Sequence, residues 1–504
     1  MRRGILGSIV ALVTGAGTAW GQAPMPITTA GGVPPAVMAG DVIQAQGPAP
    51  VIMPPNTFGP PSDPMGLGPT GGLGPPPGPM YPMPGPYGAP QFQPPPPGQN
   101  GDGGYNVLSR FEFSGAYNIW FGKSQAVPMP LLTTSAPSQA GVLGASSTLV
   151  LAGGQPIAYN GISGMQLTSS FYGDDDRRFG ALVTGFYTED RTISTKIGVA
   201  GAGFNGTSAD IPVLARPYID TTSGPTSLVV GGPNIGLASA IVTTSTQTWG
   251  VEASGVWNLF RTSPNEKWFV STDLVIGYKF LELKEDLAVI TNTSVNAVTT
   301  TPIFGIGPSG FPVQTGTQIT PIPIPVAGVT VVAPGSILIT DRFTTTNLFN
   351  GTTVGFRNEI RYGMFSLEAI GKIGLGDMHQ ILEISGSTNT VSGTGATGAA
   401  YGGLYANASN IGRYSHDDFA VIPEVQANFG INLTRSLTAY FGYNFMYMTH
   451  VIRPGGQMNP VIDGTSVPLS STYGVSGLNP GFRSVFNQTD YWLMGANFGL
   501  SFKY

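Results

Sequence analysis

The last fourteen residues alternate without interruption between apolar side chains and polar, small or mixed ones. One register carries Trp492, Met494, Ala496, Phe498, Leu500, Phe502 and Tyr504, and the other carries Tyr491, Leu493, Gly495, Asn497, Gly499, Ser501 and Lys503. Because a strand turns successive side chains to opposite faces, one face is apolar to the final residue. A soluble domain rarely ends this way, whereas lipid is the solvent for that face in a membrane barrel. The segment therefore predicts the closing strand of a transmembrane β-barrel.

The composition narrows the class of protein further. Charged residues make up only 10% of the 504 residues, against roughly 25% in typical soluble domains. No stretch beyond the N-terminus has the roughly 20 continuous apolar residues that a transmembrane helix needs, so a membrane protein of this composition must be a barrel. The chain has no cysteine, which excludes a disulfide framework. The net charge of −5 without a basic cluster argues against nucleic acid as a partner.

The N-terminus has the pattern of a secretory signal peptide. Met1-Arg2-Arg3 precedes an apolar run from Ile5 to Val13, and Ala19-Trp20-Gly21 places small residues where signal peptidase requires them. We expect residues 1–21 to be removed and the chain to be exported. The alternative is a short membrane anchor.

Residues 22–104 form a separate segment rich in proline and glycine. It holds more than half of the 45 prolines, and between Pro24 and Gly98 only Asp41 and Asp63 are charged. Such a sequence cannot bury a core and is predicted to be a disordered linker with extended stretches. About 75 residues at roughly 3.1 Å each reach on the order of 200 Å, enough to cross a periplasm. It is either a flexible tail without a specific partner or a contact with the cell wall or another protein.

The remaining residues, 105–504, repeat the period-two alternation of the C-terminus. Clean alternation occurs at about 111–121, 249–259, 268–280, 354–360, 365–375, 421–433 and 437–447, and weaker alternation at 162–172 and 178–190. With the final segment this predicts ten strands, in a range of 10 to 14, because β-branched runs at 290–301 and 329–332 can add hairpins.

The connections between these segments alternate in length. Short links fall near 173–177, 261–267, 362–363 and 434–435, and long links at about 122–161, 191–246, 284–348, 378–417 and 451–489. A β-sandwich also alternates along its strands. Tight periplasmic turns facing long external loops are, however, typical of an outer-membrane barrel. The sequence therefore predicts an all-β, antiparallel up-and-down barrel with both ends periplasmic.

If the apolar register faces lipid, the opposite register lines the lumen. The residues predicted there are Arg110, Glu112, Glu252, Asp273, Lys279, Arg357, Glu359, Arg361, Glu368, Lys372 and Glu424. Both signs of charge are mixed, and a barrel of about ten strands is too narrow for a wide pore. Pairing of these charges with each other is favoured over a selectivity filter.

The sequence contains no clear catalytic or metal-binding motif. His416-Asp417-Asp418 combines an imidazole with carboxylates, but adjacent residues of an extended chain point to opposite sides. Asp174-Asp175-Asp176 can attract calcium, yet the arginines that follow favour a charged turn. The glycines at 392–395 follow no strand–helix pattern and are not a phosphate loop. We predict no enzyme activity, no cofactor and no metal site.

Several motifs resemble β-barrel porin family 7 of planctomycete outer membranes. They include Pro128-Met129-Pro130-Leu131-Leu132-Thr133-Thr134, Asp176-Arg177-Arg178-Phe179-Gly180, Arg216-Pro217-Tyr218, Gly277 to Leu283, Asp341-Arg342-Phe343-Thr344-Thr345, Ser409 to Arg413 and Val451-Ile452-Arg453-Pro454-Gly455. The resemblance covers about residues 108–504 and implies an outer-membrane barrel. The family typically ends in phenylalanine, where this chain has Tyr504. Phe498, Leu500, Phe502 and Tyr504 are the candidate insertion signal for the barrel-assembly machinery.

These observations predict an integral outer-membrane barrel that is a porin or a structural surface barrel with long external loops. Its expected partners are outer-membrane lipid, the assembly machinery and, through the linker, the cell wall. An alternative is a secreted β-rich surface-layer or adhesive protein that never enters lipid. A barrel enzyme is a more distant third.

Overall fold

The computed structural model describes residues 110–174, 176–198, 212–263, 266–296, 298–327, 329–470, 472–474 and 486–503. The chain divides between Pro96 and Pro97 into two units, and every described residue belongs to the second. The predicted signal peptide (1–21), the predicted linker (22–104) and Tyr504 lie outside the described residues. Within the described part, no helix is long and apolar enough to cross a membrane.

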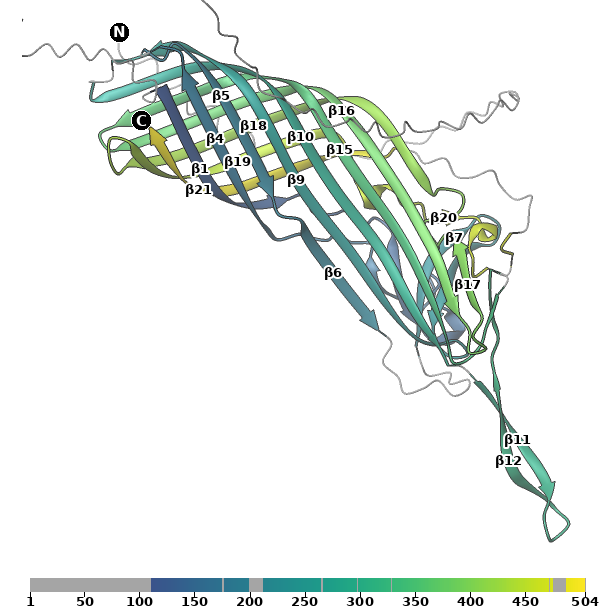
Figure 1. Cartoon of the computed structure of the whole chain (residues 1–504). Coiled ribbons are helices and arrows are strands. Elements are labelled where there is room, and N and C mark those ends of the chain that lie inside the picture. Colours follow the sequence, from purple (N-terminus) through teal and green to yellow (C-terminus); the bar gives the residue numbers. More distant parts are fainter. Residues whose placement is uncertain are drawn as a thin grey trace, which may run out of the picture. The chain divides into compact units, whose positions relative to one another are not determined.

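Ten antiparallel strands close into a ring (Figure 1). In ring order they are β1 (Phe111–Gly122), β4 (Gly161–Tyr172), β5 (Phe179–Thr188), β9 (Gly236–Arg261), β10 (Trp268–Val295), β15 (Gly335–Tyr362), β16 (Phe365–Val391), β18 (Gly412–Asn432), β19 (Leu437–Ile452) and β21 (Gln488–Lys503). Strand β1 pairs with β4 on one side and with β21 on the other, which closes the ring. The predicted up-and-down barrel of ten strands is confirmed.

Four tight connections join neighbouring strands at one end of the barrel, as predicted. The link from β4 to β5 contains the acidic run that was considered for calcium. Asp174 instead accepts hydrogen bonds from the backbone N–H groups of Arg178 at 2.7 Å and Phe179 at 3.4 Å. Asp176 forms an ion pair with Arg178 at 3.0 Å. A charged turn therefore accounts for these residues, and among the described residues no group of three or more acidic or histidine side chains is placed to hold a metal.

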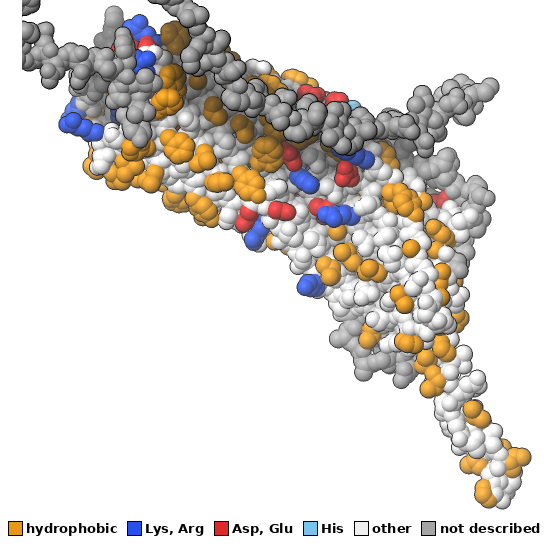
Figure 2. Space-filling view, in the orientation of Figure 1, with side chains coloured by type: hydrophobic (Ala, Val, Ile, Leu, Met, Phe, Trp, Pro, Cys, Tyr) orange, Lys and Arg blue, Asp and Glu red, His pale blue; other side chains and the backbone are white. Residues whose placement is uncertain are grey.

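The outward face of the barrel is apolar only over part of each strand. On β16 the outward positions run from Phe365 through Leu375, and beyond them come Asp377, His379 and Glu383. Figure 2 shows hydrophobic side chains over the barrel end and charged side chains beginning beyond them. An apolar band roughly 25 Å tall is what a membrane barrel presents to lipid. We infer that this belt is the membrane-spanning zone and that the strands continue past it.

A charge placed in the belt tests this orientation. Phe498 on β21 is 54% exposed on the outward face. We expect Phe498→Asp to lower the yield of heat-modifiable, assembled barrel in gels, because a lipid-facing charge costs a few kcal/mol near the midplane. The matched control is Ser385→Asp, on the outward face of β16 but beyond the belt. Equal assembly of both variants contradicts the placement of the belt.

Four strands are much longer than the sequence predicted. Residues 236–246, 284–295, 335–348 and 378–391, assigned to long links, are regular strand in β9, β10, β15 and β16. Their outward faces are rich in threonine, serine and charge, so they lack the pattern of a lipid-facing strand. Their inward faces are apolar because they pack on protein. Two short strands extend this sheet: β6 (Arg191–Gly198) pairs with β9, and β17 (Thr397–Tyr401) with β16.

The remaining long links fold into a second sheet. Its strands are β2 (Pro130–Ser135), β3 (Leu149–Gly153), β7 (Val213–Asp220), β8 (Gly224–Gly231) and β20 (Val461–Ile462), with short 3₁₀ turns η2 (Pro137–Gln139), η3 (Pro454–Gln457) and η4 (Gly464–Ser466). Leu131, Leu132 and Leu214 of this sheet share one buried core with the strand extensions. We call this sheet, with the extensions of β9, β10, β15 and β16, the external domain. The described parts of the long links thus form a folded domain.

A buried ion pair joins the two parts of the external domain. Arg216 on β7 lies 2.5 Å from Asp341 on β15, and both side chains are fully buried. The Arg216 guanidinium lies 4.7 Å from the ring centre of Tyr405, and the Tyr405 hydroxyl donates to the Pro217 carbonyl at 3.0 Å. Asp341 also accepts the backbone N–H of Ala406 at 2.7 Å. Burial and the nearby Asp341 carboxylate raise the pKa of Tyr405, although Arg216 opposes them, so the hydroxyl stays protonated.

Two hairpins between β10 and β15 stay outside the barrel ring. They are β11 (Val298–Ile306) with β12 (Pro312–Pro321), and β13 (Ile324–Val326) with β14 (Val329–Val331). The β-branched runs that were expected to add hairpins do so in part: 298–301 and 329–331 lie in these hairpins, whereas 290–295 belongs to β10.

Asp220 gives the external domain a dependence on pH. Its carboxylate accepts backbone N–H groups of Thr222 at 2.9 Å, Ser223 at 2.8 Å and Gly464 at 3.0 Å, which ties the β7–β8 turn to η4. Burial alone raises the pKa of Asp220, but these donors bring it below its ordinary value. A depressed pKa stabilises the folded form above the unfolded value, and this stabilisation is lost as the pH falls through the folded pKa.

We therefore expect limited proteolysis at the β7–β8 turn to increase below about pH 4. Asp220→Asn is expected to raise cleavage at neutral pH and to remove most of this pH dependence. Mass spectrometry of the fragments locates the cut. Identical pH profiles for the two proteins contradict this role of Asp220.

Candidate functional site

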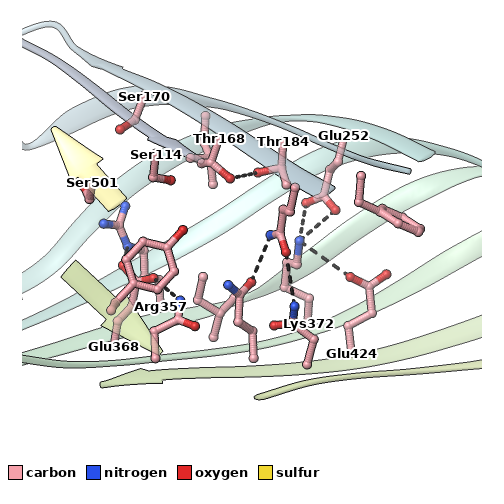
Figure 3. A pocket seen from close by; sticks show the side chains of 18 of the residues that line it. Ser114, Thr168, Ser170, Thr184, Glu252, Arg357, Glu368, Lys372, Glu424 and Ser501 are labelled. Carbon is pink, nitrogen blue, oxygen red and sulfur yellow. Dashed lines mark hydrogen bonds and ion pairs between the residues drawn. The ribbon is translucent and has the colours of Figure 1, made fainter. Parts of the chain in front are cut away.

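Two lysines and two glutamates meet inside the barrel (Figure 3). Glu252 on β9 stands opposite Lys279 on β10, and Lys372 on β16 stands opposite Glu424 on β18. Glu252 receives Lys372 Nζ at 2.7 Å and Lys279 Nζ at 3.0 Å. Lys279 also contacts Glu424, and Lys372 lies 3.8 Å from it. Cross-strand pairing thus produces a closed four-charge ring of net zero charge.

Glycine on the intervening strand β15 leaves room for this ring. Gly355 stands opposite Lys372 in the register. A Cβ on Gly355 would lie 2.7 Å from Lys372 Cγ and 2.2 Å from the Gly371 carbonyl oxygen, both shorter than real contacts. The missing side chain lets Lys372 cross in front of β15 to reach Glu252. Thr353, also inward on β15, donates to Glu252 at 3.2 Å.

A second charged group lies nearer the tight turns. Arg357 pairs with Glu368 at 2.9 Å and donates to the Tyr172 hydroxyl at 3.2 Å. Lys503 lies 3.2 Å from Glu112 and 3.7 Å from Glu359. Opposite charges again compensate each other across different strands.

Amide side chains fill the space between these groups. Asn497 Nδ2 donates to Asn428 and to Asn444, both at 3.1 Å. Asn444 Nδ2 donates to Gln166 at 3.2 Å, and Gln166 Nε2 reaches Gln426 at 3.4 Å. Because an amide side chain carries both donors and an acceptor, such a network links strands without net charge.

A cavity of about 160 Å³ remains among these polar groups. Of the residues predicted to line the lumen, those that border the cavity are Glu112, Glu252, Lys279, Arg357, Glu359, Glu368, Lys372 and Glu424. The other three lie elsewhere. Arg110 donates to the Gly173 carbonyl at 2.7 Å, Asp273 accepts from Asn258 at 2.6 Å, and Arg361 pairs with Glu359 at 3.0 Å and lies over the Phe269 ring. Lys503, which the alternation of the final strand also predicts to face the lumen, borders the cavity, as do Gln166, Gln426, Asn428 and Asn444.

An apolar layer fills the interior on the external side of the charged ring. Inward side chains from nine of the ten barrel strands meet there; they are Trp120, Ile162, Phe186, Leu281, Leu283, Phe349, Met378, Ala420, Ile422, Met446, Met448, Val451, Tyr491 and Leu493. Phe349, Met378 and Leu493 are fully buried. The sequence also contains a pattern that indicates this layer. In Phe280-Leu281 and Trp492-Leu493 both registers are apolar, which indicates burial on both faces.

A buried ion pair lies next to the apolar layer, where β19 ends. Arg453 lies 2.6 Å from Glu285 on β10, with 2% and 0% of the side chains exposed. The guanidinium also donates to the Ser124 carbonyl at 2.7 Å and the Lys123 carbonyl at 3.1 Å. Burial lowers the pKa of Arg453, but the Glu285 carboxylate more than compensates, so its pKa lies above the ordinary value. We call Arg453 and Glu285, with these carbonyls, the polar lock.

The histidine region does not form the arrangement considered from sequence. Asp417 contacts His379 on the neighbouring strand, on the exposed outward face. The ring of His416 packs against Phe486 with ring centres 5.5 Å apart. His416 and Asp417 therefore point apart, as the extended backbone predicts.

Phe498, Leu500 and Phe502 of the candidate insertion signal lie outward on β21 with 54%, 54% and 39% of their surfaces exposed. Asn497, Ser501 and Lys503 lie on the inward face of the same strand, where Ser501 donates to Glu112 at 3.1 Å. The role of the three apolar residues in insertion stays a prediction.

The family model described as "Putative beta barrel porin-7 (BBP7)" matches residues 114–304 and 324–504. The chain belongs to this family. Membership agrees with the resemblance inferred from the motifs and assigns the BBP7 chain to the outer membrane. No curated protein matches the sequence at a significant level.

Solved structures show only remote likeness to this BBP7 protein. The outer membrane protease OmpT of Escherichia coli is 10% identical with a TM-score of 0.33, over 79% of this chain and 98% of that one. The toluene transporter TodX of P. putida is 8% identical with a TM-score of 0.14, over 79% of this chain and 92% of that one. A bacterial polysaccharide outer membrane secretin is 7% identical with a TM-score of 0.14, over 79% and 100%. Similarities with such low sequence identities and TM-scores give no information about the function of this chain.

The charged ring can be tested by a double-mutant cycle with Glu252→Gln and Lys279→Met. Removing one member of a buried ion pair costs roughly 3–5 kcal/mol, so we expect each single variant to unfold at lower urea concentration in lipid vesicles. The double variant should lose less than the sum, because the two residues contact each other. Asp176→Asn, in an exposed turn pair, is the control and should change stability little. Strict additivity contradicts the coupling.

Proposed function

We propose that this protein is a closed outer-membrane barrel that anchors the external domain at the cell surface. The single observation that carries the proposal is the apolar layer across the barrel interior. A porin needs a continuous aqueous path, and here side chains from nine strands meet in the interior instead.

The apolar layer opposes the passage of ions and polar solutes. Leu281, Leu283, Phe349 and Met378 present no hydrogen-bonding groups and are fully buried. A hydrated ion that enters such a layer loses its water without gaining a partner, which is the basis of hydrophobic gating. The polar cavity on the other side of the layer is therefore the blind end of a water-filled vestibule.

The polar lock adds a second closure. Arg453 follows β19 directly, and its contacts with Glu285, Ser124 and Lys123 hold the β19–β21 link and the β1–β4 link against β10. These contacts fasten loops at the external mouth to the barrel. The charged side chains nearer the tight turns form ion pairs between different strands, as predicted for a narrow barrel.

The belt of outward apolar residues favours this proposal over a secreted surface-layer or adhesive protein. A protein that never enters lipid has no physical reason to expose Phe356, Phe429, Phe441 and Phe498 on one continuous band. An enzyme of the barrel class has less support, since the His379–Asp417 contact lies on the exposed outward face.

The proposal includes the steps that bring the protein to its place. Export through residues 1–21, insertion guided by Phe498, Leu500, Phe502 and Tyr504, and contact of the 22–104 linker with the cell wall are each consistent with the sequence. The linker would tie the barrel to the wall from the periplasmic side, while the external domain faces outward.

Conductance in planar bilayers tests the closure. We expect the wild-type protein to give no steady ionic current, because the apolar layer interrupts the aqueous path. Arg453→Ala leaves Glu285 buried without its cation, which loosens the mouth, so we expect intermittent current and a lower temperature of heat modification.

Arg413→Ala is the matched control for this variant. Arg413 also pairs with a glutamate, Glu383 at 3.2 Å, but on the surface with 68% and 54% of the side chains exposed. Such a pair contributes little, so the control should behave as the wild type. Regular, stable current steps from the wild-type protein would contradict a closed barrel and favour the porin function.

A further inference from the structure

The β11–β12 hairpin carries an apolar tip without a partner among the described residues. Ile306, Phe311 and Phe304 are 85%, 73% and 62% exposed, and Ile303 and Val313 are also exposed. These five side chains lie at the turn end of the hairpin, whereas the base is richest in threonine and carries one exposed large apolar side chain, Ile319. Figure 2 shows the hydrophobic side chains gathered at the tip.

The match to the family model leaves out the turn and the second strand of the hairpin. The match to the family model is interrupted between residues 304 and 324, and this gap contains Ile306, Phe311 and Val313. Among the described residues the hairpin pairs with no other strand. Neither the barrel ring nor the second sheet therefore depends on the hairpin for backbone pairing.

The electrostatics of the segment are unusual. No Asp, Glu, Lys or Arg occurs between Asp286 and Asp341. Two backbone hydrogen bonds close the turn at the tip: the Gly307 N–H donates to the Phe311 carbonyl at 3.0 Å and the Gly310 N–H to the Gly307 carbonyl at 2.9 Å. Gly310 has φ +76°, which a side chain rarely adopts. The tip can thus enter the polar–apolar interface of a bilayer without carrying a charge into it.

Both faces of the tip are apolar, which points to a lipid surface rather than a protein partner. Ile303 and Phe304 are adjacent in one strand and so point to opposite faces, yet both are exposed. A hairpin that docks by one sheet face leaves the other face to water and has no use for apolar residues there. A standard protein interface also uses roughly 20–30 residues a side, whereas this tip offers five large apolar side chains.

The number of residues between the belt and the hairpin indicates which bilayer the tip meets. Strand β10 continues for 15 residues after Phe280, its last outward apolar residue in the belt. At about 3.3 Å per residue and a tilt of about 40°, this raises the base of the hairpin roughly 40 Å above the belt. The arm from Val298 to Ser309 reaches about 35 Å. Figure 1 shows the hairpin continuing beyond the ends of β10 and β15, away from the barrel ring, so its tip points away from the bilayer that holds the barrel.

We propose that the β11–β12 hairpin inserts its tip into the interface of a second lipid bilayer, such as a vesicle or a neighbouring envelope facing the external domain. Interfacial insertion of a few apolar side chains is weak for one copy. Many barrels in one membrane would add their contacts, because later hairpins then bind at a high effective concentration. The protein would thereby tether membranes.

A fluorophore at the tip tests the insertion, and the absence of native cysteine makes the label specific. Ser309→Cys is labelled with an environment-sensitive dye in the full-length protein held in lipid nanodiscs. Adding vesicles of phosphatidylcholine and phosphatidylglycerol should raise the emission at least about twofold and shift it to the blue, as the dye leaves water. Thr320→Cys, at the base of the same hairpin, should not respond.

Charge variants give an independent measurement. Ile306→Asp and Phe311→Asp should each reduce co-flotation of the nanodisc-held protein with vesicles about tenfold, because each puts a charge in place of an apolar side chain that would enter the lipid. Thr300→Asp, an exposed position near the base, should float as the wild type. Heat-modifiable migration confirms that each variant keeps its barrel.

Three results would overturn the proposal. The first is an unchanged Ser309→Cys emission when vesicles are added. The second is an emission that is already high in the nanodisc alone, which would place the tip in the barrel's own bilayer. The third is an emission that follows protein concentration without vesicles, which would make a second copy the occupant.

Discussion

The backbone hydrogen bonds of the barrel must all be satisfied within the ring, because lipid offers no partner for an open N–H or carbonyl group. The pairing of β1 with β21 meets this requirement, since it joins the first strand to the last and leaves no edge in the belt. Everything else in the molecule is arranged around that closed wall. Side chains on its outer face meet lipid over the belt, and those on its inner face must fill or line a narrow space.

The inward side chains change in chemical character along the barrel axis. Near the tight turns, charged and amide side chains compensate one another across strands, as in the ring formed by Glu252, Lys279, Lys372 and Glu424. Beyond them the same inward register becomes apolar, so the interior there resembles the core of a soluble protein. Further out, β9, β10, β15 and β16 leave the belt and become one wall of the external domain. Three of these strands, β10, β15 and β16, therefore contribute in turn to the membrane wall, the apolar layer and the core of the external domain.

This continuity has a mechanical consequence. Arg216–Asp341 and Arg453–Glu285 each join a loop element to one of the long strands and are fully or almost fully buried. A buried pair strongly disfavours removal of one partner. The loops at the external mouth are thereby held to the barrel wall, which suits a surface anchor more than a channel with mobile gates. The uncharged β11–β12 hairpin contrasts with this, since it pairs only with itself and its apolar tip is exposed.

The sequence by itself determined the barrel, the number of its strands and the direction in which each strand faces. Period-two alternation in segments such as 437–447 is a local property, and it survives folding because lipid imposes it on every outward residue. The family motifs also predicted a β-barrel. The tertiary structure decided which inward residues meet: Glu252 and Lys372 are 120 positions apart, and only ring closure through β15 brings them together. It also decided that the described parts of the long links form a domain and that an apolar layer lies across the barrel interior. A strand whose outward face meets water and whose inward face meets protein has no lipid signature, so its length and its partners depend on packing between distant segments.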